Sequence, residues 1–306
     1  MHYPRELDRR DFLRWTAGAA AVGVGQAVLP SVWADEGGAK PWNMRLSTSS
    51  IHFKHLRVEE ALKQIARLGF AGVDIWSAYQ GCPHLDDVVN RLGAAGLSQT
   101  LAEQKLALFA FSVYVGGYPR YAKLLGDAGG GVAIRGSGAQ CPPAELSKKM
   151  GLFLESLKPE IELAEKHNSY LAIENHGHAL LDSLDSFKAF TDQNKSPRVG
   201  IALAPYHLQA RNDSVEEAIR ISGQQLFFFY AWQHAQGTAQ LPGHGPTDFR
   251  PWIAALAKVN YRGYVNPFMH GDLPADEMTR ALTKSRDYLR QCHSQTLPSK
   301  SAPHSR

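Results

Sequence analysis

The sequence is poor in cysteine and contains no apolar run long enough to span a membrane. Its 306 residues include 3 cysteines, and Cys82, Cys141 and Cys292 are widely separated, without any Cys-x-x-Cys pair. This spacing supports neither a disulfide framework nor a zinc knuckle. The longest apolar stretch, residues 15–29, is shorter than the ~20 residues of a transmembrane helix.

Charge is also sparse and shows little bias of sign. Lys and Arg number 33 against 29 Asp and Glu, giving a formal net charge of +4, and no basic run is interleaved with aromatic residues. We therefore expect no nucleic-acid partner. Apolar residues at 44% are ordinary for a folded soluble protein. The length accommodates one α/β barrel of ~250 residues with a short leader and tail.

The N-terminus has the pattern of an export signal. Arg9 and Arg10 precede the apolar, small-residue stretch 15–29, and Val32-Trp33-Ala34 stands before Asp35. This pattern predicts a twin-arginine signal over residues 1–34, cleaved after Ala34, and therefore a periplasmic or extracellular protein. An uncleaved membrane anchor is the alternative. After cleavage we expect no contact with the membrane, a linker over 35–42, a barrel over 43–293 and a disordered Ser/Pro-rich tail over 294–306.

Short apolar strands alternate with amphipathic helices from residue 42 onward, which predicts a parallel sheet with helical crossovers. The expected strands are 44–47, 71–76, 106–112, 131–135, 170–174, 199–203, 226–232 and 264–268. The expected helices are 58–68, 85–105 with a break near 93–97, 118–125, 143–167, one from 183, one capped by Ser214, 249–259 and 278–291.

Eight such units in order predict the α/β class and a (β/α)8 TIM barrel. An open doubly wound sheet is the alternative fold. It is disfavoured because Ser47-Thr48-Ser49-Ser50, rather than a Gly-x-Gly-x-x-Gly turn, follows the first strand.

Function in such barrels gathers at the C-terminal ends of the strands. Glu174 closes the fifth expected strand, and a carboxylate buried there without a partner would be costly. Imidazoles gather at the same ends: His176, His207, His234 and His270. The strand-end aromatics Trp76, Tyr114, Tyr206 and Trp232 suit either sugar stacking or core packing. Arg135 suits either a substrate contact or a surface charge.

Four segments together carry a family resemblance. They are 60–76, with Gly69-Phe70-Ala71-Gly72-Val73-Asp74-Ile75-Trp76, then Ala172-Ile173-Glu174-Asn175-His176-Gly177, the Gly-rich segment 241–249, and Tyr261-Arg262-Gly263-Tyr264. In this order the chain resembles the xylose-isomerase-like superfamily of sugar-phosphate isomerases and epimerases.

The resemblance implies a divalent cation held by four strand-end residues. The family places a Glu after strand five, an Asp three residues before a His after strand six, a His after strand seven and a Glu after strand eight. Glu174 and His207 match two of these residues. The strand-six Asp falls on Ala204, the strand-seven His on or near Ala231, and the last Glu near Phe268.

Two interpretations of this site remain open. In the first, a remodelled site holds Mn, Zn, Fe or Ni through Glu174, His207 and His270, because imidazole and carboxylate suit these metals. In the second, the metal is lost, and Glu174 with His207 forms a catalytic acid/base pair.

The resemblance and the strand-end residues together predict a carbohydrate-active isomerase, epimerase or lyase. It would abstract a proton next to a carbonyl of a free sugar, keto-sugar or glycoside. The substrate-binding residues would be Trp76, Tyr114, Arg135, His176, Tyr206, Trp232 and His234. A non-catalytic barrel that binds a sugar or a partner is the alternative, and the sequence leaves open whether the chain forms a homo-oligomer.

Overall fold

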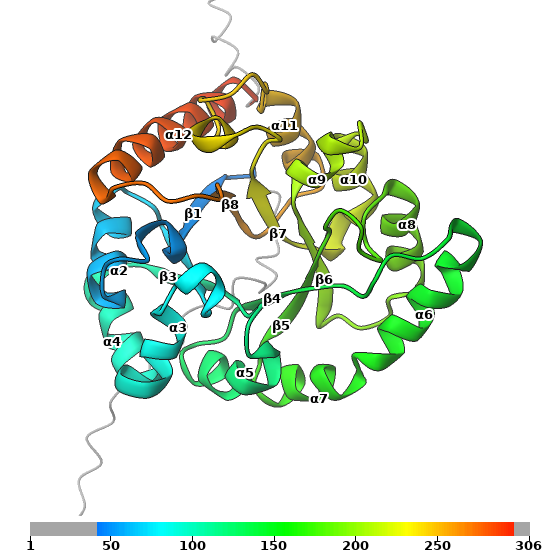
Figure 1. Ribbon diagram of the computed structural model, residues 1–306, viewed down its shortest axis with the longest axis horizontal. Coiled ribbons are helices and arrows are strands. Elements are labelled where there is room, and N and C mark those ends of the chain that lie inside the picture. Colours follow the sequence, from blue (N-terminus) through cyan, green and yellow to red (C-terminus); the bar gives the residue numbers. More distant parts are fainter. Residues whose placement is uncertain (1–41, 297–306) are drawn as a thin grey trace, which may run out of the picture.

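Eight parallel strands close into a barrel in chain order, with β1 hydrogen-bonded to β8 (Figure 1). The computed structural model describes residues 42–296. The strands are β1 (Arg45–Ser49), β2 (Gly72–Trp76), β3 (Ala107–Ser112), β4 (Val132–Gly136), β5 (Tyr170–Glu174), β6 (Val199–Leu203), β7 (Leu226–Ala231) and β8 (Tyr264–Pro267). The predicted (β/α)8 TIM barrel is confirmed.

The helices form a ring outside these strands (Figure 1). They are α2 (Val58–Arg67), α3 (His84–Asp87), α4 (Gly93–Gln104), α5 (Gly117–Asp127), α6 (Leu146–Ser156), α7 (Lys158–Lys166), α8 (Leu184–Gln193), α9 (Pro205–Ala210), α10 (Val215–Ser222), α11 (Arg250–Lys258) and α12 (Ala275–Thr296). Within residues 42–296, no helix combines the length and the apolar character needed to cross a membrane.

Several boundaries differ from those expected. The long helix expected over 143–167 is divided between α6 and α7, where Pro159 occupies the first turn of α7 and cannot donate a backbone hydrogen bond to α6. The short helix α9 was not predicted. Ser294–Thr296, expected in the tail, complete α12. The predicted leader over 1–34 and the linker residues 35–41 lie outside the described residues.

The helices pack on the strands through their apolar faces. In α2 the residues Val58, Ala61, Leu62 and Ile65 are buried at helical spacing. Gly69 follows this helix with φ +76°, a left-handed conformation that glycine adopts without steric cost. The expected helix face and its glycine stop are therefore both present.

Inward-facing aromatic rings fill the barrel. Phe109 stacks on Phe228 with ring centroids 4.8 Å apart, and Phe228 contacts Tyr230 at 4.5 Å. Tyr230 in turn packs against Phe268 at 5.1 Å. Gly72 of β2 allows the Tyr264 ring to approach, since a Cβ there would lie 3.0 Å from that ring. The interior below the strand ends is thus a packed core rather than a channel.

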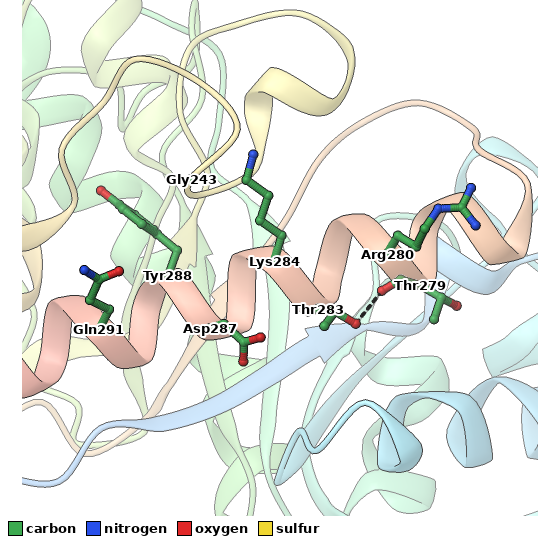
Figure 2. Close-up of a pocket in the computed structure, with 8 residues that line it drawn as sticks. All are labelled: Gly243, Thr279, Arg280, Thr283, Lys284, Asp287, Tyr288 and Gln291. Atoms are coloured by element: carbon green, nitrogen blue, oxygen red, sulfur yellow. Dashed lines mark hydrogen bonds between the residues drawn. The ribbon is translucent and has the colours of Figure 1, made fainter.

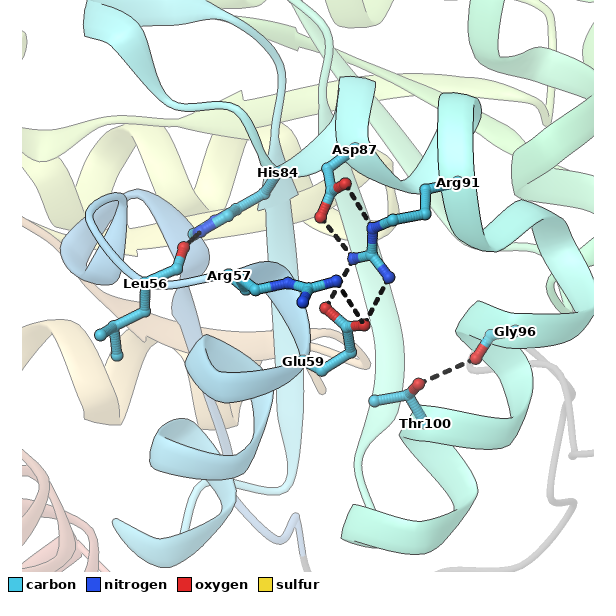
Figure 3. Close-up of polar contacts among 8 residues, drawn as sticks. All are labelled: Leu56, Arg57, Glu59, His84, Asp87, Arg91, Gly96 and Thr100. Carbon is cyan, nitrogen blue, oxygen red and sulfur yellow. Dashed lines mark hydrogen bonds and ion pairs between the residues drawn. The ribbon is translucent and has the colours of Figure 1, made fainter.

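An arginine fork joins α2 to the segment after β2 (Figure 3). Arg91 lies in the short π-helical segment Val88–Leu92 and donates two hydrogen bonds to Glu59 of α2, both of 2.7 Å. It also donates to Asp87 of α3 at 2.8 and 2.6 Å. Bidentate pairing of this kind fixes geometry more than it adds stability at an exposed position.

The cap of α10 provides a stability prediction. The Ser214 hydroxyl accepts a hydrogen bond of 3.1 Å from the Glu217 backbone N–H, as its place before two glutamates predicted. Ser214→Ala should lower the free energy of unfolding by about 1 kcal/mol. Denaturant titration measures this change, and Ser214→Asp, which keeps an acceptor, should retain most of the stability. Equal losses in both variants would contradict the cap.

Candidate active site

A small cavity of about 180 Å³ opens at the C-terminal ends of the strands. Its lining comes from the ends of β2, β4, β5 and β7 and from the segments that follow β2, β3, β5, β6 and β8. The lining residues are Trp76, Tyr79, Tyr114, Gly136, Glu174, His176, His207, Tyr230, Phe268 and His270. Six predicted site residues therefore meet in one place: Trp76, Tyr114, Glu174, His176, His207 and His270.

Strand register directs the Glu174 side chain into the barrel. Glu174 pairs with Gly136 of β4 and Ala202 of β6, and Ala202 belongs to the interior core. Gly136 has no side chain, and a Cβ built there would meet nothing within 4 Å. The carboxyl group therefore has free space beside it at the cavity wall.

The Glu174 carboxyl is buried and hydrogen-bonded by one phenol. Tyr114 donates a hydrogen bond of 2.8 Å to Glu174 Oε2, and the Tyr114 oxygen lies 3.1 Å from the Tyr230 hydroxyl. Burial raises the pKa of Glu174 to about 7, although the Tyr114 hydrogen bond opposes this rise. A carboxyl group with this pKa can both accept and release a proton near neutral pH.

Two histidines face the cavity with free ring nitrogens. Among the described residues, His207 Nε2 and His270 Nδ1 are buried side-chain atoms without a hydrogen-bond partner. Burial, followed by neighbouring histidines, lowers the pKa of His207 to about 3 and that of His270 to about 4. Both rings are therefore neutral at neutral pH. The His176 ring lies 4.0 Å from that of His207, centroid to centroid.

Three predicted substrate residues form a layer behind His207 and do not line the cavity. Tyr206 stacks on Trp232 with centroids 4.3 Å apart, and the exposed His234 meets the edge of Tyr206 at 4.8 Å. Trp232 lies edge-on to His207 at 5.3 Å and donates a 2.8 Å hydrogen bond to Gln240. Tyr206 and Trp232 thus pack against the His207 ring, and none of the three residues lines the cavity.

The structure does not bring Arg135, a predicted substrate residue, to the cavity. Arg135 forms an ion pair with Glu160 of α7, outside the barrel. The strand register explains why the Arg135 side chain points away from the barrel interior. Arg135 pairs with Ile173, whose side chain belongs to the core between strands and helices. Neighbouring residues of a strand point to opposite faces, so Gly136 rather than Arg135 reaches the cavity.

Asn175 fixes the turn that presents His207. Its side-chain oxygen accepts a 2.7 Å hydrogen bond from the Ala204 backbone N–H, and its amide donates to the Ala204 carbonyl at 3.1 Å. Ala204 precedes α9, which carries His207. Asn175, the residue after β5, thus fixes the backbone of Ala204, which is the position that the resemblance assigns to an aspartate.

Sequence reasoning missed three residues of this region. Tyr79 and Tyr230 line the cavity, and Asp74 lies inside the barrel with no exposed surface. Asp74 is an acidic residue within the otherwise apolar strand 72–76. Because a buried acid is costly without a partner, its place in the sequence could have marked it as a candidate site residue. Tyr230 gave no such signal, because it follows three phenylalanines in a strand that predicts core packing.

The donor set does not fit the metal that the resemblance implies. Residues 42–296 contain no group of three or more His, Cys, Asp or Glu side chains placed to hold a metal ion. The predicted metal set of Glu174, His207 and His270 is therefore not supported. Ala204, Ala231 and Phe268, at the other implied ligand positions, are fully or almost fully buried and have no metal-binding side chain.

A larger hollow of about 630 Å³ lies along α12 (Figure 2). Thr279, Thr283, Lys284 and Asp287 line it together with Gly243, which precedes α11. It shares no residue with the strand-end cavity. Because its lining lies on the outer helix rather than at the strand ends, we place the candidate active site in the smaller cavity.

Sequence comparison identifies one family. The family model described as xylose isomerase-like TIM barrel matches residues 62–292, which is most of the chain. No curated protein sequence matches.

Solved structures with the same fold include sugar epimerases. A 3-keto-D-glucoside 4-epimerase from E. coli superposes with a TM-score of 0.63 at 17% identity, covering 80% of this chain and 100% of that one. D-psicose 3-epimerase from Clostridium cellulolyticum H10, with D-tagatose, gives 0.64 at 15% identity, covering 82% and 99%. The IOLI protein, with a binding zinc atom, gives 0.63 at 14%, covering 83% and 99%. At these identities the likeness establishes the fold alone.

Proposed function

Because the chain belongs to the xylose isomerase-like TIM barrel family, we propose that it is a carbohydrate-active isomerase, epimerase or lyase. It acts by proton abstraction next to a carbonyl, without the metal that the family resemblance implies. The observation that carries this proposal is the buried Glu174 carboxyl, whose pKa of about 7 suits a general base facing a cavity.

The cavity lining favours a neutral sugar over a sugar phosphate. Among its lining residues there is no Lys or Arg to neutralise a phosphate group. Trp76 and Phe268 both line the cavity, and flat aromatic rings of this kind pack against the apolar face of a sugar ring. The neighbours that act on D-psicose and on a 3-keto-D-glucoside are consistent with a keto-sugar substrate.

His207 supplies the second group of the mechanism. Its Nε2 atom is buried and has no protein partner among the described residues. As a neutral imidazole it hydrogen-bonds the substrate at the carbonyl or the adjacent hydroxyl while Glu174 takes the carbon-bound proton. Tyr114 donates to the Glu174 carboxylate and holds it in one orientation.

We also propose export by the twin-arginine route and a periplasmic or extracellular location. The support is the Arg9-Arg10 pattern and the apolar stretch that follows it. An exported enzyme meets free sugars more readily than phosphorylated ones, which agrees with a cavity lining without Lys or Arg.

Solvent-hydrogen exchange tests the proposal directly. The purified protein is incubated in D2O with a panel of free aldoses, ketoses and 3-keto-glucosides, and with the phosphate ester of each. The expected result is deuterium at a carbon next to the carbonyl for at least one free sugar and for none of the esters. Absence of exchange across the panel, or exchange with esters only, would contradict the proposal.

Binding without catalysis is the second candidate. The apolar residues Ala204, Ala231 and Phe268, at implied ligand positions, favour it. A sugar that binds in calorimetry but never exchanges hydrogen with solvent would support this alternative over catalysis.

A further inference from the structure

The segments that follow β4, β5 and β6 form a second cavity of about 180 Å³, which we call the outer pocket. Gln140, Asp182 and Arg211 make its polar side. It shares no lining residue with the strand-end cavity, and the mechanism above does not use it.

Two chain segments lead from the strand-end cavity to the outer pocket. After β5, His176 lines the first cavity and Ala179 the second, across a turn closed by a 3.1 Å hydrogen bond from the Ala179 N–H to the His176 carbonyl. After β6, His207 of α9 lines the first cavity, and Arg211, directly after α9, lines the second. Residues four apart share a helix face and lie about one turn, or ~6 Å, from each other. The two cavities are therefore neighbours.

Hydrogen bonds hold the segments after β4 and β5 together. The Leu180 N–H donates to the Gly138 carbonyl at 2.7 Å, and the His176 N–H donates to the Leu181 carbonyl at 3.0 Å. The Ser137 hydroxyl accepts a further hydrogen bond of 3.0 Å from the Leu181 N–H. The outer pocket is thus built on backbone that is fixed without a ligand, as small-molecule sites usually are.

The polar side of the outer pocket pairs an acceptor with a donor. Asp182 is 6% exposed and accepts a 2.8 Å hydrogen bond from the Gln140 amide, which takes one of the roughly four acceptor positions of a carboxylate. Arg211 Nη1 lies 3.6 Å from Asp182 Oδ2, which is longer than a hydrogen bond. A carboxylate and a guanidinium side by side can bind two neighbouring hydroxyl groups, one as donor and one as acceptor.

The rest of the lining favours a neutral ligand with an apolar face. Two carboxylates, Asp182 and Asp185, stand against the single cation Arg211, so the pocket disfavours an anion. Leu146 and Leu180 supply apolar surface on the other side. A sugar ring has both features, because its hydroxyl groups lie at the edge and its C–H groups lie on the faces.

We propose that the outer pocket binds a second, neutral sugar unit of a glycoside whose reacting unit lies in the strand-end cavity. Ligand pockets usually measure roughly 300–1,000 Å³. Neither cavity reaches this size alone, whereas the two together do. The place of the reacting unit rests on the proposed function. The binding of the second unit depends only on the outer pocket.

Calorimetry on the full chain tests the second unit without turnover. The probes are methyl glycosides of glucose, galactose and mannose and of the disaccharides built from them, which have no free carbonyl group. At least one methyl disaccharide should bind about 10-fold more tightly than the methyl glycoside of either of its units, because it adds hydrogen bonds to charged groups. If no disaccharide binds more tightly than its units, the proposal is overturned. Tighter binding of the matching disaccharide with a glucuronic acid unit would overturn the neutral class.

Asp182→Asn and Arg211→Gln test the residues that bind the second unit. Either variant should lower the affinity for the preferred methyl disaccharide about 10-fold, to that of the methyl monosaccharide, whose own affinity should not change. Arg220→Gln is the matched control, since Arg220 is exposed and pairs with Glu217 of α10. It should leave both affinities unchanged.

The Arg211 side chain is exposed, so Arg211→Gln stays informative if Asp182→Asn does not fold. Unchanged disaccharide affinity in the folded variants, or an equal loss for the monosaccharide, would overturn the outer pocket as a sugar site. The two proposals fail separately. Without the proposed function no sugar exchanges hydrogen with solvent, but the preference for a disaccharide persists. Without the outer site a free sugar still exchanges, but the preference is absent.

Discussion

Glu174→Gln should lower turnover of the sugar substrate by about 10²- to 10⁴-fold, the usual contribution of a positioned general base. The amide is nearly isosteric and can still accept the Tyr114 hydrogen bond, but it cannot take a proton. The rate of deuterium incorporation at saturating substrate measures the loss.

Glu160→Gln is the matched control for this prediction. Glu160 pairs with Arg135 outside the barrel and does not line the cavity. Its variant should retain the wild-type rate. A Glu174→Gln protein with full activity, or equal losses in both variants, would refute the assignment of Glu174 as the base.

The pH dependence of the rate should follow from the same group. Because the pKa of Glu174 is raised to about 7 and the base form is the carboxylate, kcat/KM should rise with pH through about 7. Acid activation over this interval would contradict Glu174 as a base.

His52→Gln should make the protein less sensitive to acid. His52 is buried beside Phe268, contacts Thr48 at 3.1 Å and accepts a 3.3 Å hydrogen bond from the Met269 backbone N–H. Burial lowers the pKa of His52 from 6.5 to about 3. Its neutral form thus stabilises the fold above pH 6.5, and this stability is lost as pH falls from 6.5 towards 3.

The expected size of this effect is large for one residue. Between about pH 6.5 and about pH 4 the wild type should lose about 3 kcal/mol more of its free energy of unfolding than His52→Gln. Denaturant titrations at the two pH values measure the difference. His55→Gln is the control, because the His55 side chain is exposed and contacts Asp272 at 2.8 Å. Parallel acid losses in the wild type and His52→Gln would contradict the prediction.

Other buried groups also make the stability of the fold depend on pH, so the wild type and the variants must be compared at the same pH. The lowered pKa values of His207 and His270 act in the same direction as that of His52. The raised pKa values of Asp74 and Glu174 act oppositely: their stabilising protons are present at low pH and are lost as pH rises through about 7. These other groups are present in both proteins, so the difference in acid sensitivity between the wild type and His52→Gln reports on His52.

The fold was predictable because its signals are local. Most strands are short apolar runs, as in β7 (Leu-Phe-Phe-Phe-Tyr-Ala), and helices such as α2 and α10 show buried positions at helical spacing. The strands 170–174 and 199–203 have the expected bounds. The helix α9 was missed because it is short and begins only two residues after the end of β6, although the proline at its start is favoured in a first helical turn.

The site was predictable only in part, because side-chain direction depends on register. Residues that end a strand were correctly expected near one another, as Glu174 and His207 show. Arg135 also ends a strand, but it faces the helices because its pairing with Ile173 places it on the outer side. The Asp74 side chain meets Ser112, and Tyr230 meets Tyr114, inside the barrel through pairings of distant strands, which one sequence does not reveal.

The measurement that most directly tests the account is solvent-deuterium exchange by protein dialysed against a strong chelator, with the residual metal content determined in parallel. We predict that wild-type protein free of divalent metal still exchanges the carbon-bound hydrogen of a free keto-sugar, and that Glu174→Gln does not. Exchange that disappears on chelation and returns with an added divalent cation would contradict a Glu174-centred site that works without metal.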